Sequence, residues 1–375
     1  MMVPPKRQTT RRAFLKGESA TRELGDAVDR ALGTSTRRRG TRTGAVETNE
    51  GPYLLQVSRR AMACRFEVAF NAGQYPQSSA AAIAALDLVE QLEARLTVYR
   101  PTSEIMHINR SAAREAVAVE DRLCDLLAMA LALSRRTDGA FDITAGPLSK
   151  VWGFDRRAGA VPDQEELERA RGRVGSELVE LDAAARTIRF RTEGVEINLG
   201  GIGKGYALDR CAEQFADAGI NDYLWHAGNS SLLARGAQGS ASAGKDGWVV
   251  GILHPQRRSQ RLAEIRLRNQ ALSTSATSTQ FFRHNGRRYG HILDPRTGWP
   301  ATSGVLLATV VAPTAAEAEA LSTAFYVLGA ERTEELCAAD GRIGAALVCG
   351  GEAGRGVQVR CFGSVEESVR VFRGN

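Results

Sequence analysis

A glycine-rich segment around one lysine is the first stretch of this sequence that could do chemistry. It runs Ile-Asn-Leu-Gly-Gly-Ile-Gly-Lys-Gly-Tyr-Ala-Leu-Asp from Ile197 to Asp209, with Lys204 among four glycines. Gly194–Ile197 resembles a short strand, and the apolar spacing that follows predicts a helix from about Gly203. Bare N–H groups at a helix N-terminus, together with a lysine, can bind a phosphate. The alternative is a tight strand-to-helix turn with an incidental lysine, because no standard nucleotide-binding glycine spacing is matched.

A second candidate is the segment His-Ile-Leu-Asp-Pro-Arg-Thr-Gly from His291 to Gly298. It brings an imidazole, a carboxylate and a guanidinium into one turn bounded by proline and glycine. A neutral imidazole could remove a proton from a hydroxyl nucleophile. Alternatively His291 is a buried, hydrogen-bonded side chain and Asp294 caps the turn.

A third candidate lies in the segment 310–325, where Thr314 and Glu317 have the spacing of a helix-capping box. Glu319 and Thr323 then fall four residues apart on one helical face. A carboxylate and a hydroxyl offer the hard oxygens that Mg²⁺ prefers, although such a pair on a solvated surface is the commoner situation.

These candidates must be positioned by strands and helices that alternate irregularly along the chain. Helices are predicted at 78–94, with Ile83, Leu86, Val89 and Leu92 on one face, and at 121–136, 163–172 and 314–328. Strands are expected at 64–70, 178–181, 187–191, 223–226, 231–234, 248–253, 263–267, 280–283, 288–293 and 305–312. Adjacent strands with interspersed helices predict an α+β fold with mixed, largely antiparallel sheets packed with helices.

The overall composition is that of a globular protein, with 43% apolar and 25% charged residues among 375. No apolar run reaches the roughly 18 residues of a membrane span, so we expect none. Six dispersed cysteines predict neither a disulfide framework nor a zinc site.

Residues 1–50 differ from the rest and predict a basic, disordered tail ahead of a folded domain over 53–375. The tail has eleven Lys/Arg against six Asp/Glu, so it holds +5 of the net charge of +6 and leaves +1 for the remainder. A nucleic-acid partner is therefore not expected. Residues 10–16 match the charged end of a twin-arginine export signal, but a polar stretch follows instead of an apolar one. This favours a cytoplasmic protein over an exported one. The segment is then expected to be a degenerate export motif or a short amphipathic helix at 18–32.

Taken together, four segments resemble motifs of the FAD:protein FMN transferase (ApbE-like) family, in the same chain order. They begin at Asp138 (Asp-Gly-Ala-Phe-Asp-Ile-Thr-Ala-Gly-Pro), Asn198 (Asn-Leu-Gly-Gly-Ile-Gly-Lys-Gly-Tyr-Ala), His291 (His-Ile-Leu-Asp-Pro-Arg-Thr-Gly) and Ala318 (Ala-Glu-Ala-Leu-Ser-Thr-Ala). The resemblance covers roughly residues 57–363 and implies an ApbE-like α+β fold.

The resemblance also implies a set of site residues. His291 would be the base that activates the acceptor hydroxyl. Metal ligands would be the Gly201 and Ser322 carbonyls, the Glu319 carboxylate (usually Asp in the family) and the Thr323 hydroxyl. FAD would be contacted by Met62, Tyr99, Ala140, Phe141, Asp142, Asn198, Lys204 and Leu293.

The implied activity is a Mg²⁺-dependent transfer of FMN from FAD to a threonine or serine hydroxyl of an acceptor protein, with release of AMP. Two alternatives remain at this point: a family member that hydrolyses FAD to FMN and AMP, and one that only binds FAD.

Overall fold

The computed structural model describes residues 53–239, 247–257, 259–277, 280–351 and 356–372. The basic tail, its arginine pair and the possible helix at 18–32 lie outside these residues.

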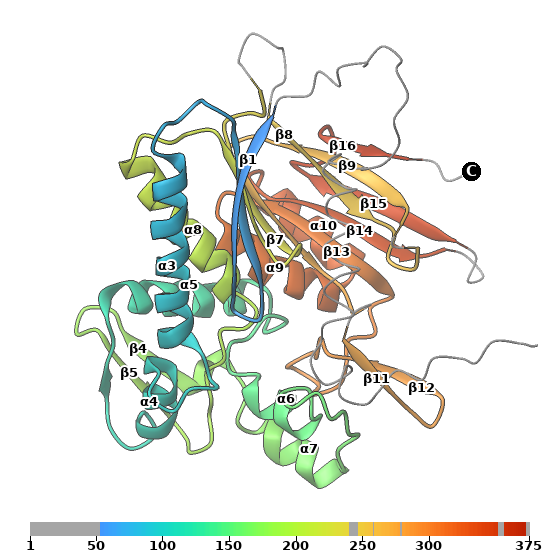
Figure 1. The fold of residues 1–375 in the computed structure, drawn as a ribbon. Coiled ribbons are helices and arrows are strands. Elements are labelled where there is room, and N and C mark those ends of the chain that lie inside the picture. The colour runs from blue at the N-terminus through green and yellow to red at the C-terminus, as the bar shows by residue number, and fades with distance from the viewer. Residues whose placement is uncertain (1–52, 240–246, 258, 278–279, 352–355, 373–375) are drawn as a thin grey trace, which may run out of the picture.

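An eight-stranded antiparallel sheet forms the centre of the described fold (Figure 1). Its strand order is β1-β2-β6-β7-β10-β13-β14-β15, and every strand pairing found among the described residues is antiparallel. The strands are β1 (Leu54–Ala61), β2 (Cys64–Asn71), β6 (Tyr223–Ala227), β7 (Ser231–Arg235), β10 (Gln270–Ser275), β13 (Val305–Ala312), β14 (Gly344–Gly350) and β15 (Val357–Gly363).

Helices pack on one face of this sheet, and their apolar sides join it in the largest hydrophobic core. Buried Phe215 of α8, for example, contacts the rings of Phe70 and Trp225 on neighbouring strands. The helices of this layer are α3 (Ser78–Leu96), α5 (Asp121–Arg136), α8 (Gly203–Asp217), α9 (Ala315–Leu328) and α10 (Ala330–Ala339).

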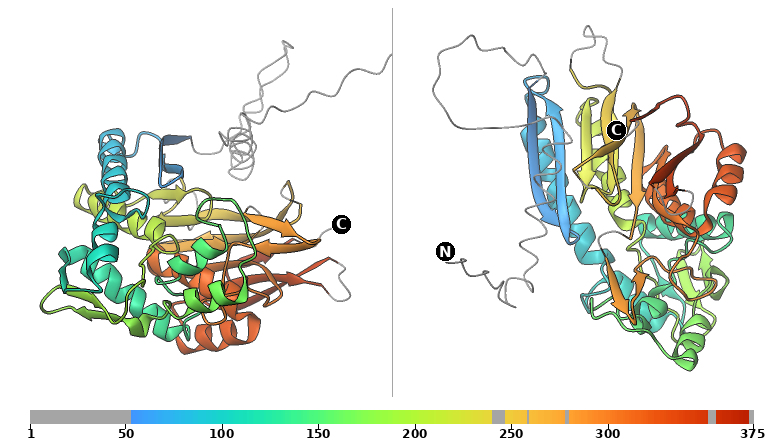
Figure 2. Two further views of the ribbon diagram at one scale, coloured as in Figure 1. Left: turned by 90° about the horizontal axis from the view of Figure 1, so that it is seen from below. Right: turned by 90° about the vertical axis from the view of Figure 1, so that its right-hand side faces the viewer.

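A three-stranded sheet covers the other face and encloses a second core with it. Its strands are β8 (Trp248–Leu253), β9 (Arg261–Leu267) and β16 (Val369–Val371). Figure 2 shows the β1–β2 hairpin, in blue, at one edge of the large sheet.

Smaller elements lie beyond the layers, below the large sheet in Figure 1. A third core, centred on Trp152, joins α6 and α7 to the β11–β12 hairpin. These elements are α4 (Glu104–Ser111), β3 (Val117–Ala118), α6 (Gly146–Val151), α7 (Gln164–Arg171), the 3₁₀ turn η1 (Ser176–Leu178), β4 (Val179–Asp182), β5 (Thr187–Phe190), β11 (Phe281–His284) and β12 (Arg287–Gly290).

The α+β prediction and the five helix predictions are confirmed, but several details are wrong. Ile83 is 50% exposed, because the buried face of α3 is formed by Ala82, Leu86 and Val89. Thr314 caps α9 through the Glu317 N–H, but the Glu317 carboxylate does not complete the capping box and instead contacts Arg136. The predicted strand at 288–293 ends at Gly290, which places His291 just past the hairpin.

The predicted strand Gly194–Ile197 is absent, and β10 was not predicted. The Asn109 side chain explains the first error. Its amide donates to the Ile197 carbonyl and accepts from the Ile197 N–H, so one side chain occupies both groups that a partner strand would bind. In the part of the chain that the structure describes, no helix is both long and apolar enough to cross a membrane.

Candidate functional site

The site is organised by the close crossing of α8 and α9. A Cβ added at Gly205 would lie 2.1 Å from the Ala315 carbonyl oxygen, so only glycine allows this approach. The two helices cap each other across it. Glu319 of α9 accepts from the Gly205 N–H at 2.7 Å, and Asp209 of α8 accepts from the first N–H groups of α9, those of Ala315 (2.8 Å) and Ala316 (2.9 Å).

This mutual capping buries a carboxylate that the sequence did not single out. Burial raises the pKa of Asp209 to about 6, although its two backbone hydrogen bonds favour the charged form. Asp209 is thus a structural acid that locks the two helices together.

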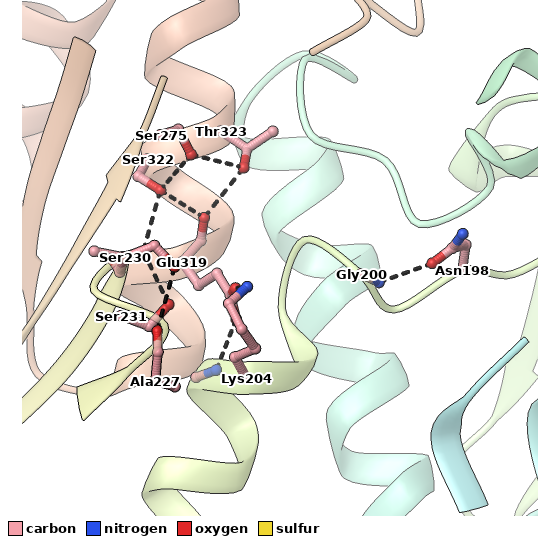
Figure 3. A network of polar contacts seen from close by, with 12 residues as sticks. Asn198, Gly200, Lys204, Ala227, Ser230, Ser231, Ser275, Glu319, Ser322 and Thr323 are labelled. Carbon is pink, nitrogen blue, oxygen red and sulfur yellow. Dashed lines mark hydrogen bonds and ion pairs between the residues drawn. The ribbon is translucent and has the colours of Figure 1, made fainter. Parts of the chain in front are cut away.

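Lys204 and Glu319 form an ion pair at the head of the crossing (Figure 3). Glu319 is only 4% exposed. Burial disfavours the Lys204 ammonium, but the Glu319 charge outweighs it and raises the pKa of Lys204. The lysine side chain is 23% exposed, so its remaining donors can reach a ligand.

The expected row of bare N–H groups at the start of α8 is only partly present. The Gly203 N–H donates to the Leu199 carbonyl at 2.7 Å, and the Gly205 N–H is taken by Glu319. Positive charge at this helix end therefore comes mainly from Lys204, and less from unpaired backbone groups than the sequence suggested.

Three hydroxyl groups meet one turn further along α9. Ser275 Oγ lies 2.9 Å from Ser322 Oγ and 3.2 Å from Thr323 Oγ1, and both α9 hydroxyls donate to the Glu319 carbonyl (Figure 3). Ser275 was not among the predicted site residues. It stands at the end of β10, itself an unpredicted strand, so no periodic pattern marked it.

The glycine-rich turn is joined to the loop before α6. The Asn198 N–H donates to the Ile143 carbonyl at 2.7 Å, while Asn198 Oδ1 accepts from the Gly200 N–H at 2.9 Å. A Cβ added at Gly201 would lie 3.3 Å from the Phe141 ring and 4.0 Å from Thr323 Oγ1. The structure therefore brings Gly201, Phe141 and Thr323 together.

The loop around Phe141 is held by its own side chains. Asp142 Oδ1 accepts from the Thr144 N–H at 2.7 Å, and Oδ2 accepts from the Ser134 hydroxyl at 3.0 Å. Burial raises the pKa of Asp142 against these bonds. Ala140 and Phe141 are buried beside it.

His291 has the protonation pattern of a base. Its Nδ1 lies 3.0 Å from the Gln280 carbonyl, which can only accept, so Nδ1 carries the proton and Nε2 presents a lone pair. Burial lowers the pKa of His291 and the Lys204 charge lowers it further. The imidazole is thus neutral near pH 7. The charge that acts on it belongs to the same lysine that pairs with Glu319.

No hydrogen bond found among the described residues joins the other three predicted FAD contacts to this group. Tyr99 is 74% exposed. Leu293 is buried in the Trp152 core and bridges to Pro300 through its backbone. Met62 stands in the β1–β2 turn, where it and Ala63 both adopt left-handed φ angles of 47° and 58°, a strained turn for non-glycine residues.

A cysteine that the sequence did not mark also borders the site. A Cβ added at Gly228 would lie 3.1 Å from Cys64 Sγ, and the Lys204 and Glu319 charges both act on this thiol. Burial raises the pKa of the Cys64 thiol to about 11. Cys64 is therefore not a thiolate nucleophile near pH 7.

The oxygen atoms gathered at the site suit a hard cation, although they include only one carboxylate. Among the described residues, no group of three or more His, Cys, Asp and Glu side chains is placed to hold a metal. The oxygen atoms that remain are those of the Glu319 carboxylate, the Ser322 and Thr323 hydroxyls and the nearby Gly201 backbone. Such all-oxygen sets suit Mg²⁺, which retains water and commonly shares a site with phosphate oxygens.

Comparisons with known proteins give a consistent result. The family model described as the ApbE family matches residues 62–347. The FAD:protein FMN transferase of Escherichia coli K12 is 30% identical over 68% of this chain and 72% of its own, and that of Treponema pallidum is 34% identical over 66% and 70%. The crystal structure of the ApbE protein of Thermotoga maritima is 29% identical, with a TM-score of 0.72 over 82% of this chain and 96% of its own. The flavin transferase ApbE from Vibrio cholerae is 25% identical, with a TM-score of 0.73 over 84% and 98%.

Proposed function

The chain belongs to the ApbE family, and on that premise we propose that it is an FAD:protein FMN transferase. The acceptor is a threonine or serine hydroxyl of another protein. Its oxygen forms a bond to the FMN phosphorus as the bond to AMP breaks, the hydroxyl proton passes to the enzyme, and AMP leaves.

The observation that carries this proposal is the combination of a lysine held by Glu319 and a histidine whose bond to Gln280 leaves Nε2 unprotonated. The Lys204 charge acts on the His291 imidazole, and Lys204 is held by Glu319 at the α8–α9 crossing. A cation whose charge acts on a neutral base suits attack of a hydroxyl on a phosphate group. The cation stabilises the charge on the pyrophosphate, and the base takes the proton.

His291 Nε2 is the atom to which we assign the proton. The Gln280 carbonyl holds Nδ1–H and so fixes the ring with Nε2 free. After transfer the imidazolium would keep its hydrogen bond to Gln280, so the ring need not turn during the reaction.

The remaining predicted residues take supporting roles in the proposal. Phe141, packed at Gly201, and exposed Tyr99 offer aromatic surfaces for the FAD rings. Glu319, Ser322, Thr323 and Gly201 would hold Mg²⁺, which when bound supplies further positive charge against the pyrophosphate.

One experiment separates transfer from its alternatives. The protein is incubated with FAD, Mg²⁺ and candidate acceptor proteins, and AMP is quantified against covalently bound flavin on a denaturing gel. We expect equal amounts of AMP and flavinylated acceptor. AMP and FMN without flavinylated protein would identify a hydrolase. Bound but intact FAD with every acceptor would contradict catalysis altogether.

A further inference from the structure

The β11–β12 hairpin carries four basic side chains, and we call it the basic hairpin. Its basic cross-strand pairs are Arg283 opposite Arg288 and His284 opposite Arg287, and all four residues are exposed. Arg283 and Arg288 share the face opposite Phe282 and Tyr289. Directly opposed side chains in an antiparallel pair have Cβ atoms only about 5 Å apart. The Arg283 and Arg288 side chains therefore start side by side on one face of the hairpin.

No carboxylate neutralises these arginines in the part of the chain that the structure describes. None of the ion pairs found within 4.0 Å there involves Arg283, Arg287 or Arg288. Like charges directly opposed on a sheet destabilise it. The free hairpin thus retains a repulsion that an external anion would relieve.

The Arg287 and Arg288 guanidinium groups are held by contacts that do not neutralise their charge. The Arg288 guanidinium lies 3.9 Å from the centroid of the Phe281 ring and donates to the Thr277 carbonyl at 2.6 Å. Arg287 lies 5.3 Å from the centroid of the Tyr289 ring. Aromatic and carbonyl contacts orient a guanidinium without cancelling its charge.

The hairpin is fixed against the body and leads directly to the candidate base. Phe282 and Tyr289 stack with their centroids 5.3 Å apart and pack on Trp152, so the opposite face of the hairpin points outward. His291 follows the last residue of β12, and its ring is bonded to Gln280, one residue before β11. At about 3.3 Å per residue, Arg288 lies roughly 10 Å along the chain from His291. Figure 1 shows the hairpin separate from the large sheet, where a partner could reach it.

We propose that the basic hairpin docks an acidic segment of the acceptor protein, with Asp or Glu side chains placed within a few residues of the hydroxyl that receives FMN. This inference rests on the proposed function. A peptide in extended form covers the roughly 10 Å between Arg288 and His291 with three to four residues. A nucleic acid is the less suitable occupant, because residues 51–375 carry a net charge of only +1 and offer no long basic track.

The test measures peptide binding directly. Two fluorescein-labelled 15-residue peptides with a central threonine are compared by anisotropy, one carrying four Asp/Glu and the other Asn/Gln at the same positions. We expect the wild-type protein to bind the acidic peptide more tightly, with an affinity that weakens as salt is added. Arg283→Gln with Arg288→Gln should weaken that binding roughly two- to thirty-fold, the combined worth of two exposed charge pairs.

The matched control removes the same charge elsewhere. Arg114 and Arg189 are exposed and have no ion pair among the described residues, so Arg114→Gln with Arg189→Gln should leave peptide binding at the wild-type level. The single variant Arg283→Gln is a control for misfolding. Arg288 bonds to Thr277, whereas no side-chain bond of Arg283 is found in the part of the chain that the structure describes. Circular dichroism checks each variant.

Three results would overturn the inference. These are equal binding of the acidic and neutral peptides, unchanged binding by the hairpin variants, and tighter binding of a single-stranded 15-nucleotide DNA that the same variants abolish. FAD binding, followed by flavin fluorescence, is measured separately. Wild-type protein that binds FAD but ignores the acidic peptide refutes only the docking surface, whereas protein that binds no FAD refutes the proposed function.

Discussion

Replacing Asp209 by Asn should change how the stability of the protein depends on pH. Burial at the α8–α9 crossing raises the pKa of Asp209 from 3.8 to about 6. The folded state therefore holds this proton more tightly than the unfolded state, and the stabilisation is complete below pH 3.8 and lost as pH rises through 6. A shift of about two units at 1.36 kcal/mol each corresponds to roughly 3 kcal/mol.

The Asn variant cannot titrate, so its unfolding free energy should gain about 2.4 kcal/mol relative to wild type between pH 4 and pH 7, because pH 4 already lies slightly above the unfolded pKa of 3.8. Urea unfolding of both proteins across this range measures the difference, and contributions from other groups cancel. Asp217→Asn is the matched control, since Asp217 lies exposed on the same helix. A constant difference between wild type and Asp209→Asn would refute the assignment of a buried, proton-holding cap.

Three further substitutions test the geometry of the site. Gly205→Ala should destabilise the protein by about 1–3 kcal/mol, because the new Cβ would overlap the Ala315 carbonyl; Gly203→Ala, whose Cβ meets nothing closer than 3.9 Å, should be neutral in the same thermal melt. Glu319→Asp shortens the reach to Lys204 and the Gly205 N–H by about 1.5 Å, so the melting temperature should fall and AMP release should need more Mg²⁺; higher activity at low Mg²⁺ would show that the site prefers Asp. Ser275→Ala removes the partner of two α9 hydroxyls and should raise the Mg²⁺ requirement at least about tenfold, whereas an unchanged Mg²⁺ titration would exclude a role for Ser275 there.

Long helices were predictable because their signals are local. The segment 121–136 has regular apolar spacing, and α5 has the same bounds. The segment Gly194–Ile197 shows the opposite case. Its backbone groups are satisfied by Asn109, which lies 88 residues away in the chain, and no local pattern reveals such a partner.

In the candidate site, too, the sequence indicated the chemical types of the residues but not which residues pair with each other. The sequence marked Lys204 for a phosphate and Glu319 for a metal, but the two residues, 115 positions apart, bind each other. Asp209 stood within the glycine-rich segment, yet its role depends on the N-terminus of α9, which only the packed fold brings to it. The sequence shows the chemical type of each side chain. Which charged groups neutralise one another depends on how α8 and α9 cross in the folded protein.

The most direct test of the central claim is the rate of FMN transfer by His291→Ala. The substitution removes the proton acceptor but leaves Lys204 and Glu319 in place, so FAD should still bind while transfer falls about 10²–10⁴-fold. Because burial and Lys204 lower the pKa of His291, the wild-type rate should decline only below the ordinary histidine value of 6.5, and the variant should lack this acid limb. A His291→Ala protein that flavinylates its acceptor at the wild-type rate, with an unchanged pH profile, would contradict the account.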